Sequence, residues 1–118
     1  MTPNEYQKLT ERTENKLEGG MRGANLLLGI AGETGELLDL LKKKYFHGKV
    51  VEKETIRDEI GDILWYIARI SDYYGFTLED FMQANIEKLM KRYPEGFNVV
   101  ASEERKDIVK DKQWTYYF

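Results

Sequence analysis

Several residue types are scarce in this 118-residue chain, and each scarcity removes a class of chemistry. Cysteine is absent, which excludes disulfides, thiolate zinc sites and cysteine nucleophiles and fits a reducing cytoplasm. His47 is the one histidine, so a histidine-rich metal site cannot form within one chain. No apolar run approaches the ~20 residues of a membrane span, and the first residues are polar, so we expect neither a membrane helix nor a signal peptide.

The balance of charged and apolar residues is that of a globular protein. Hydrophobic residues make up 42% and charged residues 33%, which argues against wholesale disorder. The formal net charge is -3, so we expect no nucleic-acid partner, because a phosphate backbone requires a basic surface. The length suits one domain with one modest core, and we expect a single domain over residues 1–118.

Proline is nearly absent as well, and its two positions enclose a long stretch that is free to be helical. The two residues are Pro3 and Pro94. Caps and apolar residues at helical spacing predict four helices, at about 3–17, 24–45, 53–74 and 77–93. The glycine-rich segment 18–23 between the first two is predicted to be a loop.

The C-terminal part carries weaker signals. Residues 101–112 favour a short helix, and the aromatic segment 113–118 favours packing on the body of the protein or on another subunit. Four helices with short connections predict an all-α fold. We expect a four-helix bundle-like core with a short extra C-terminal segment.

Two short acidic motifs repeat one pattern. "ETGE" begins at Glu33 and "EIGD" begins at Glu59, and each places a second acid three residues later, at Glu36 and Asp62. On an α-helix this spacing separates side chains by about 60° around the axis and about 4.5 Å along it, so each motif presents two carboxylates from one face. Apolar residues at helical spacing accompany both motifs, which directs the acids towards a helix interface.

Four carboxylates at a helix interface repel one another unless something neutralises them. They take up protons, destabilise the bundle or bind a divalent cation. Ligands that are all oxygen favour Mg²⁺, with Mn²⁺ as a possible substitute. The sequence has no Glu-x-x-His pair, which argues against a di-iron carboxylate bundle. The alternative is that the acids lie on a solvated face and that the repeat is a coincidence.

The segment "GIAGETGELLDLLKK" and the later "DEIGDILWYIARISDYYGFTLEDFMQANIEKLMKRYPEGF" together resemble the MazG-like family of all-α nucleoside triphosphate pyrophosphohydrolases. The resemblance covers residues 26–97 and leaves 98–118 as a tail outside it. It implies Mg²⁺-dependent hydrolysis of nucleoside or deoxynucleoside triphosphates to the monophosphate and pyrophosphate. It also implies a homodimer or homotetramer, with Glu33, Glu36, Glu59 and Asp62 as the metal ligands.

The resemblance extends to the fourth predicted helix, through the motif Asn-x-x-Lys-x-x-x-Arg-Tyr-Pro. It implies that this helix faces the nucleotide through Asn85, Lys88, Arg92 and Tyr93. The chemistry favours the same use, since Lys88 and Arg92 lie four residues apart and can neutralise phosphate oxygens. Glu36, or else Glu33, is the candidate catalytic base that takes a proton from the attacking water.

Two further residues, Lys44 and Trp65, have two interpretations each, and the glycines beside the acids have an expected role. Lys44 in the basic run 42–49 is either a ligand of the triphosphate or part of a cationic helix end, which the helix dipole favours. Trp65 either stacks on a nucleobase or packs in the core or against another subunit. The glycines of the two motifs, Gly32, Gly35 and Gly61, are expected to remove side-chain bulk, so that a neighbouring backbone or a bound phosphate can approach the acids.

Other functions compete with triphosphate hydrolysis. A helical interaction module without catalysis is the alternative from a different class, with the acids serving solubility. A pyrophosphohydrolase of another phosphorylated metabolite, of the phosphoribosyl-ATP or alarmone type, is the alternative within the same chemistry. The sequence leaves the base and the sugar of the substrate open.

Overall fold

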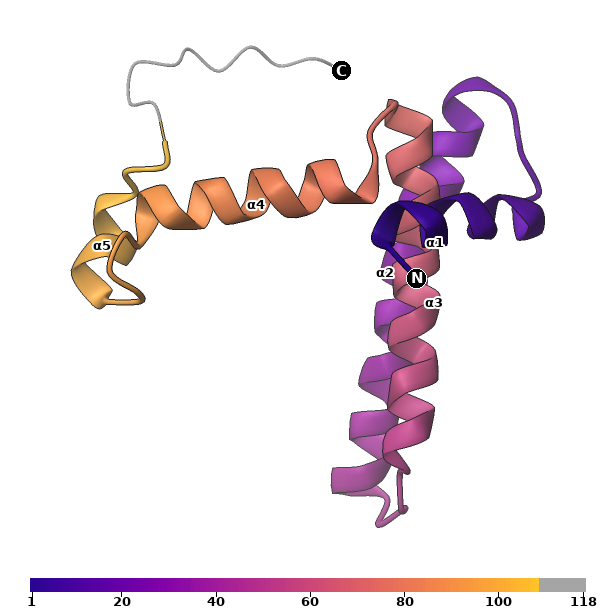
Figure 1. The fold of residues 1–118 in the computed structure, drawn as a ribbon. Coiled ribbons are helices and arrows are strands. Elements are labelled where there is room, and N and C mark those ends of the chain that lie inside the picture. The colour runs from indigo at the N-terminus through magenta and orange to yellow at the C-terminus, as the bar shows by residue number, and fades with distance from the viewer. Residues whose placement is uncertain (109–118) are drawn as a thin grey trace. The chain divides into compact units, whose positions relative to one another are not determined.

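The computed structural model describes residues 1–108, and every regular element in this part of the chain is helical, which confirms the all-α class. The elements are α1 (Pro3–Thr10), the 3₁₀ turn η1 (Glu11–Thr13), α2 (Gly19–Phe46), α3 (Lys53–Tyr74), α4 (Leu78–Arg92) and α5 (Val99–Glu104) (Figure 1). None of these helices combines the length and the apolar character needed to cross a bilayer. The chain divides into two compact units, Met1–Asp80 and the residues from Phe81 onward, so the single domain stays a prediction.

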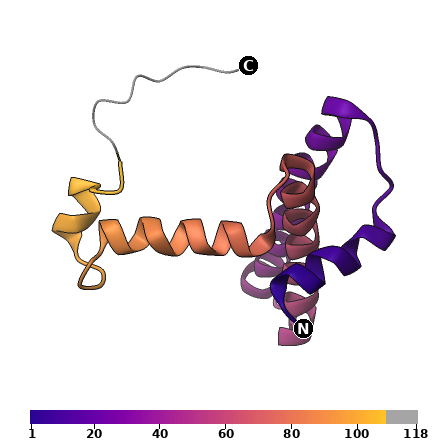
Figure 2. The ribbon, with the colours of Figure 1, turned by 45° about the horizontal axis from the view of Figure 1, so that its top comes forward.

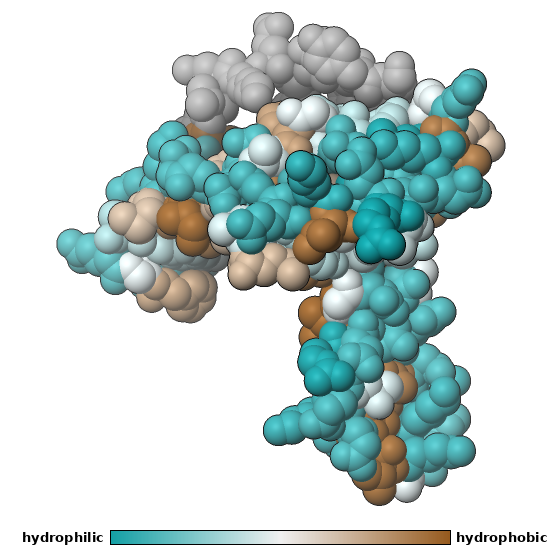
Figure 3. Space-filling model, turned by 45° about the vertical axis from the view of Figure 1, so that its right-hand side comes forward, coloured by the Kyte–Doolittle hydropathy of each residue, from teal (hydrophilic) through white to brown (hydrophobic). Residues whose placement is uncertain are grey.

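The first unit is organised around a hairpin of two long helices. α2 and α3 run antiparallel and side by side, joined by the turn at 47–52, and α1 packs across α3 (Figures 1 and 2). Leu26, Ala68 and Ile70 are buried where these helices meet. Many other apolar side chains of the hairpin are exposed, and they form brown patches along it in Figure 3. The buried core is therefore small for helices of this length.

The helix ends follow the capping signals of the sequence. Thr2 and Glu5 form a capping box at the start of α1, in which each side chain accepts from the other residue's backbone N–H. Thr77 and Asp80 make the same reciprocal bonds before α4, at 3.1 and 2.8 Å. Gly75 ends α3 with φ 77°, a left-handed conformation that glycine adopts without a steric penalty.

The predicted boundary between the first two helices is wrong. α1 ends at Thr10, not near residue 17, and α2 begins at Gly19, inside the segment expected to be a loop. Tertiary contacts override the low helix propensity of glycine here. Arg22 on the first turn of α2 bonds to Glu14, and a Cβ at Gly23 would lie 2.6 Å from a ring carbon of Tyr73.

The second unit contains most of α4 and all of α5. The Asn98 side chain accepts a hydrogen bond from the Ala101 N–H at 2.7 Å and caps α5, which begins before the short helix expected at 101–112. Arg92, the last residue of α4, bonds through Nε and Nη2 to both oxygens of Asp107, at 2.8 and 2.9 Å. The aromatic segment 113–118 lies outside the described residues.

Candidate functional site

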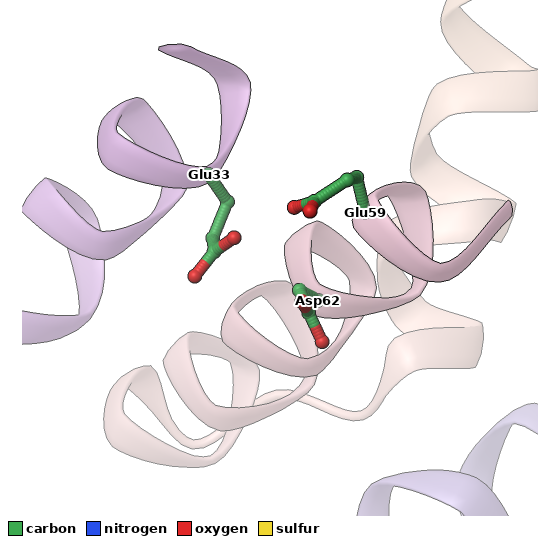
Figure 4. A group of neighbouring side chains, drawn as sticks. All are labelled: Glu33, Glu59 and Asp62. Carbon is green, nitrogen blue, oxygen red and sulfur yellow. The ribbon is translucent and has the colours of Figure 1, made fainter. Parts of the chain in front are cut away.

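Three of the four predicted acidic ligands meet between α2 and α3. Glu33 of α2 and the pair Glu59 and Asp62 of α3 each place a carboxylate oxygen within 4.8 Å of the others (Figure 4). Glu33 and Glu59 are half-buried and Asp62 is exposed. The spacing of three residues thus does bring Glu59 and Asp62 to the same side of α3, facing α2.

The electrostatics of this group, here called the acidic cluster, favour the binding of a cation. One oxygen of Glu33 and one of Glu59 are buried, and neither has a hydrogen-bond partner in the described part of the chain. Burial, and then the nearby Glu36 carboxylate, raise the pKa of both groups. Buried oxygens without donors are costly, and an all-oxygen set suits a hard divalent cation such as Mg²⁺ or Mn²⁺.

Glu36 lies beside the acidic cluster without belonging to its tightest part. Its side chain is exposed, and its carboxylate is close enough to act on the charges of both Glu33 and Glu59. It stands three residues beyond Glu33 on α2, as the sequence predicts. An exposed carboxylate next to the acidic cluster is open to water, which suits the catalytic role predicted for Glu36.

A pocket of about 300 Å³ opens next to the acidic cluster. It is lined by Thr13, Glu33, Asp62, Trp65 and Tyr66, and we call it the aromatic pocket. The rings of Trp65 and Tyr66 meet edge to face with centroids 4.9 Å apart. Trp65 Nε1 donates a hydrogen bond to Thr13 Oγ1 at 2.7 Å. Flat apolar walls beside carboxylates can hold an aromatic base next to a metal-bound phosphate chain.

The glycine that permits close packing is not one of the expected ones. A Cβ at Gly32, Gly35 or Gly61 would have open space around it, so no backbone segment of the described part of the chain approaches these positions. A Cβ at Gly29 would instead overlap the ring of Tyr66. Gly29 thus shapes the aromatic pocket, and the approach of a phosphate to the other glycines stays a prediction.

The sequence interpretation missed an ion network that joins three segments. Arg69, buried on α3, donates to Glu14 at 2.8 Å and to Asp72 at 2.9 Å. Arg22 of α2 contacts the same two carboxylates. The available signal was an arginine within the apolar run around Ile67, since arginine is almost never fully buried unless it is paired.

A tyrosine from α1 also approaches the acids. Burial, and then the Asp62 carboxylate, raise the pKa of Tyr6. The N-terminal helix therefore lies close enough to the acidic cluster to feel its charge.

The predicted nucleotide-facing residues of α4 belong to the second unit, which is described by itself. Asn85 and Lys88 are exposed. Arg92 is engaged by Asp107, and the ring of Tyr93 lies 5.4 Å from that of Phe97 between centroids. The approach of these side chains to the acidic cluster stays a prediction.

Lys44 lies near the C-terminal end of α2, eight residues beyond Glu36 and so about 12 Å further along the helix axis. It is exposed, and its ammonium group lies 5.5 Å from the ring centroid of Tyr45. Its role as a phosphate ligand stays a prediction.

The acidic cluster, all of α3 and α2 from residue 22 onward fall within one family pattern. Residues 22–97 match the model of the MazG nucleotide pyrophosphohydrolase domain. The chain belongs to the MazG family. This membership agrees with the resemblance expected from residues 26–97 and covers all four predicted acids.

Two curated proteins match parts of the chain. The Gene 37 protein of Mycobacterium phage L5 is 29% identical over 73 residues, which cover 58% of this chain and 64% of the phage protein. The uncharacterized protein YvdC of Bacillus subtilis (strain 168) is 45% identical over 42 residues, which cover 36% of this chain and 40% of YvdC. The chain therefore spans less than two thirds of either relative, and no solved structure matches it significantly.

Proposed function

We propose that the protein is a Mg²⁺-dependent pyrophosphohydrolase that converts nucleoside or deoxynucleoside triphosphates to the monophosphate and pyrophosphate. The observation that carries the proposal is the pair of buried oxygens of Glu33 and Glu59, which have no hydrogen-bond partner within residues 1–108. They come from the two motifs of a MazG-family domain and face each other between α2 and α3. A divalent cation satisfies both oxygens at once.

The residues of the first unit would have three different roles in this reaction. Glu33, Glu59 and Asp62 would hold Mg²⁺, with Mn²⁺ as a substitute, and the ion would supply charge neutralisation for the phosphate chain. Glu36, exposed beside them, would accept a proton from the water that attacks phosphorus. Trp65 would contact the base from the wall of the aromatic pocket.

The fourth-helix motif would complete the site. Lys88 and Arg92 would neutralise phosphate oxygens, with Asn85 and Tyr93 directed to the sugar or base. Arg92 would have to exchange Asp107 for phosphate, or bind it with the guanidinium nitrogen that Asp107 leaves free.

We also propose that the protein is a homodimer or homotetramer. Apolar side chains stay exposed on the long helices, among them Leu38 (57%) and Ile60 (51%) on the hairpin and Ile86 (57%) on α4. Helices usually bury an apolar face of this kind against other helices, and a second copy of the chain would provide those helices. Analytical ultracentrifugation of the wild type and of Leu38→Lys tests this. A monomeric wild type would contradict it.

No membrane or nucleic-acid partner is expected, and a cytoplasmic location stays a prediction.

The experiment for the activity is a panel of canonical and modified triphosphates, assayed for pyrophosphate and for monophosphate with Mg²⁺ and with Mn²⁺. Pyrophosphate as the product, rather than orthophosphate, identifies cleavage between the α and β phosphates. Glu59→Gln should lose activity, while Glu54→Gln, exposed on the first turn of the same helix, should keep it.

The alternatives are tested by adding phosphoribosyl-ATP and an alarmone to the same panel. Turnover of phosphoribosyl-ATP or an alarmone alone would show that the protein is a pyrophosphohydrolase of that metabolite rather than of nucleoside triphosphates. No turnover of any substrate with either ion would leave a helical interaction module without catalysis and would reject the proposal.

A further inference from the structure

A buried ion pair ties the N-terminal segment, defined here as residues 3–14, to α3. Arg69 is 1% exposed and Glu14 is 2% exposed, and Arg69 Nε lies 2.8 Å from a Glu14 oxygen. Arg69 Nη1 also donates to the Gln7 carbonyl and to Thr10 Oγ1, each at 3.2 Å. A buried guanidinium is stable only when acceptors surround it, so the network favours this position of the segment against α3.

A second arginine holds the same carboxylate from α2. Arg22 donates through Nε and Nη2 to the two oxygens of Glu14, at 2.7 and 2.9 Å. Two parallel bonds of this kind fix the orientation of a carboxylate as well as its position. Glu14 is therefore fixed by α2 and α3 together.

The residue before Glu14 forms part of the aromatic pocket. Thr13 Oγ1 accepts the hydrogen bond of Trp65 Nε1 at 2.7 Å and donates its own to the Thr10 carbonyl at 3.1 Å. The hydroxyl thus links the indole to the N-terminal segment. Because the indole has one N–H, this is the one hydrogen bond that the Trp65 side chain can donate, and it acts together with the edge-to-face contact on Tyr66 to hold the ring at the pocket wall.

One face of α3 carries the whole arrangement. Asp62, Trp65, Arg69 and Asp72 follow one another at separations of three, four and three residues, which is the spacing of one helical face. The face begins at the acidic cluster, continues through the pocket wall and ends at the ion network. Arg69, which holds the N-terminal segment, and Trp65, which forms the pocket wall, are therefore one helical turn apart on the same face of α3.

We propose that Thr13 determines which nucleobase the protein accepts by holding the Trp65 ring, and that Glu14 is the positioning residue that holds Thr13. This inference rests on the proposed function. Every triphosphate offers the acidic cluster the same phosphates, so differences between nucleotides must be recognised elsewhere. Thr13 and Glu14 also precede residues 22–97, the part that matches the family model.

The test compares Thr13→Val, which keeps the shape and removes the hydroxyl, with Thr13→Ser, which keeps the hydroxyl. The ratio of kcat/KM between the best pyrimidine and the best purine triphosphate is measured for both variants and the wild type. We expect the ratio to change by about three- to tenfold in Thr13→Val, through KM rather than kcat, as the loss of one hydrogen bond predicts. Thr13→Ser should keep the wild-type ratio.

A merely structural role for Thr13 would lower activity with every base alike. Equal ratios in the wild type and in Thr13→Val would therefore overturn the inference, even where the total activity falls. The same result would leave the proposed function intact, because the wild type would still release pyrophosphate.

Binding gives a second readout that needs no turnover. The chain has two tryptophans, so Trp65 is the one fluorophore of its kind in a Trp114→Phe background. α,β-Methylene triphosphates, which resist cleavage at the expected bond, should quench its fluorescence with base-dependent affinity. Thr13→Val should reorder these affinities and Thr13→Ser should not. If the wild type hydrolyses nothing, the proposed function fails, and the absence of base-dependent quenching overturns this inference separately.

Discussion

Glu33 and Glu59 face each other from α2 and α3, and each keeps one buried oxygen without a hydrogen-bond partner among residues 1–108. Burial and the neighbouring carboxylates raise the pKa of both side chains. The ionised pair therefore weakens the fold, and a cation bound here would use the same oxygens as ligands. Under the proposed function, metal binding would stabilise the fold at this contact.

We expect Glu59→Gln to raise the melting temperature of the metal-free protein, because an amide removes one of the charges that repel each other. The variant should also gain less from Mg²⁺ than the wild type does. Differential scanning fluorimetry with and without MgCl₂ measures both effects, and Glu54→Gln on the exposed first turn of α3 should behave like the wild type. A Mg²⁺-induced rise in Glu59→Gln equal to that of the wild type would place the ion elsewhere.

Glu14 makes the fold sensitive to acid. Its hydrogen bonds from Arg22, and then those from Arg69, lower its pKa from 4.5 to about 2 against the opposing effect of burial. Because the folded pKa lies below the unfolded one, the stabilisation is complete above about pH 4.5 and is lost as the pH falls towards 2. Glu14→Gln should remove this part of the pH dependence.

Urea unfolding at a series of pH values measures the effect. At pH 7 we expect Glu14→Gln to lower the free energy of unfolding by about 3–5 kcal/mol, since it leaves buried guanidinium groups without their anion. Glu11→Gln is the control, because Glu11 pairs with Lys16 at the surface and should contribute less than about 1 kcal/mol. A pH profile of Glu14→Gln parallel to that of the wild type would show that Glu14 is not the titrating group.

The glycines of α2 should respond to alanine in opposite directions. Gly29→Ala puts a methyl group into the ring of Tyr66 and should destabilise the protein by about 1–3 kcal/mol and reshape the aromatic pocket. Gly35→Ala places the same group in open space and should stabilise the helix by up to about 1 kcal/mol. Thermal unfolding of both variants gives the signs. A stabilised Gly29→Ala would contradict the packing of Tyr66.

The contact between Arg92 and Asp107 should hold the second unit together. The Asp107 side chain is 2% exposed, and Arg92 and Arg105 both donate to it. Asp107→Asn should therefore speed amide hydrogen exchange in α5, because the charge that joins the C-terminal end of α5 to Arg92 of α4 is lost. Glu104→Gln changes only an exposed pair with Lys106 and serves as the control. Unchanged exchange in Asp107→Asn would mean that other contacts keep α5 in place.

The acidic cluster could be predicted from the sequence because its information is local. A spacing of three predicts that each pair of acids shares one helix face. The apolar pattern is a weaker guide to the inward face, because Leu38 and Ile60 beside the motifs are exposed. The caps at Thr2 and Thr77 were predictable because their signals are local too. Each needs only the few residues around it.

The wall of the aromatic pocket could not be predicted in this way. Thr13 meets Trp65 from 52 residues away, and Glu14 meets Arg69 from 55 residues away. No periodicity in residues 3–18 signals these partners, and the two glycines at the start of α2 argue for a loop where contacts made by Arg22 and Gly23 impose a helix. Propensity is weak against several tertiary bonds.

The ion network also bears on what counts as one domain. The family pattern begins at Arg22, but Arg69 inside it takes the carboxylate of Glu14, the hydroxyl of Thr10 and the carbonyl of Gln7 from the residues before. A fragment cut at the family boundary would keep the acidic cluster, but Arg69 would lose these three partners and keep only the carboxylate of Asp72 among its described partners. The segment that matches the family and the segment joined by the ion network are thus of different lengths in this protein.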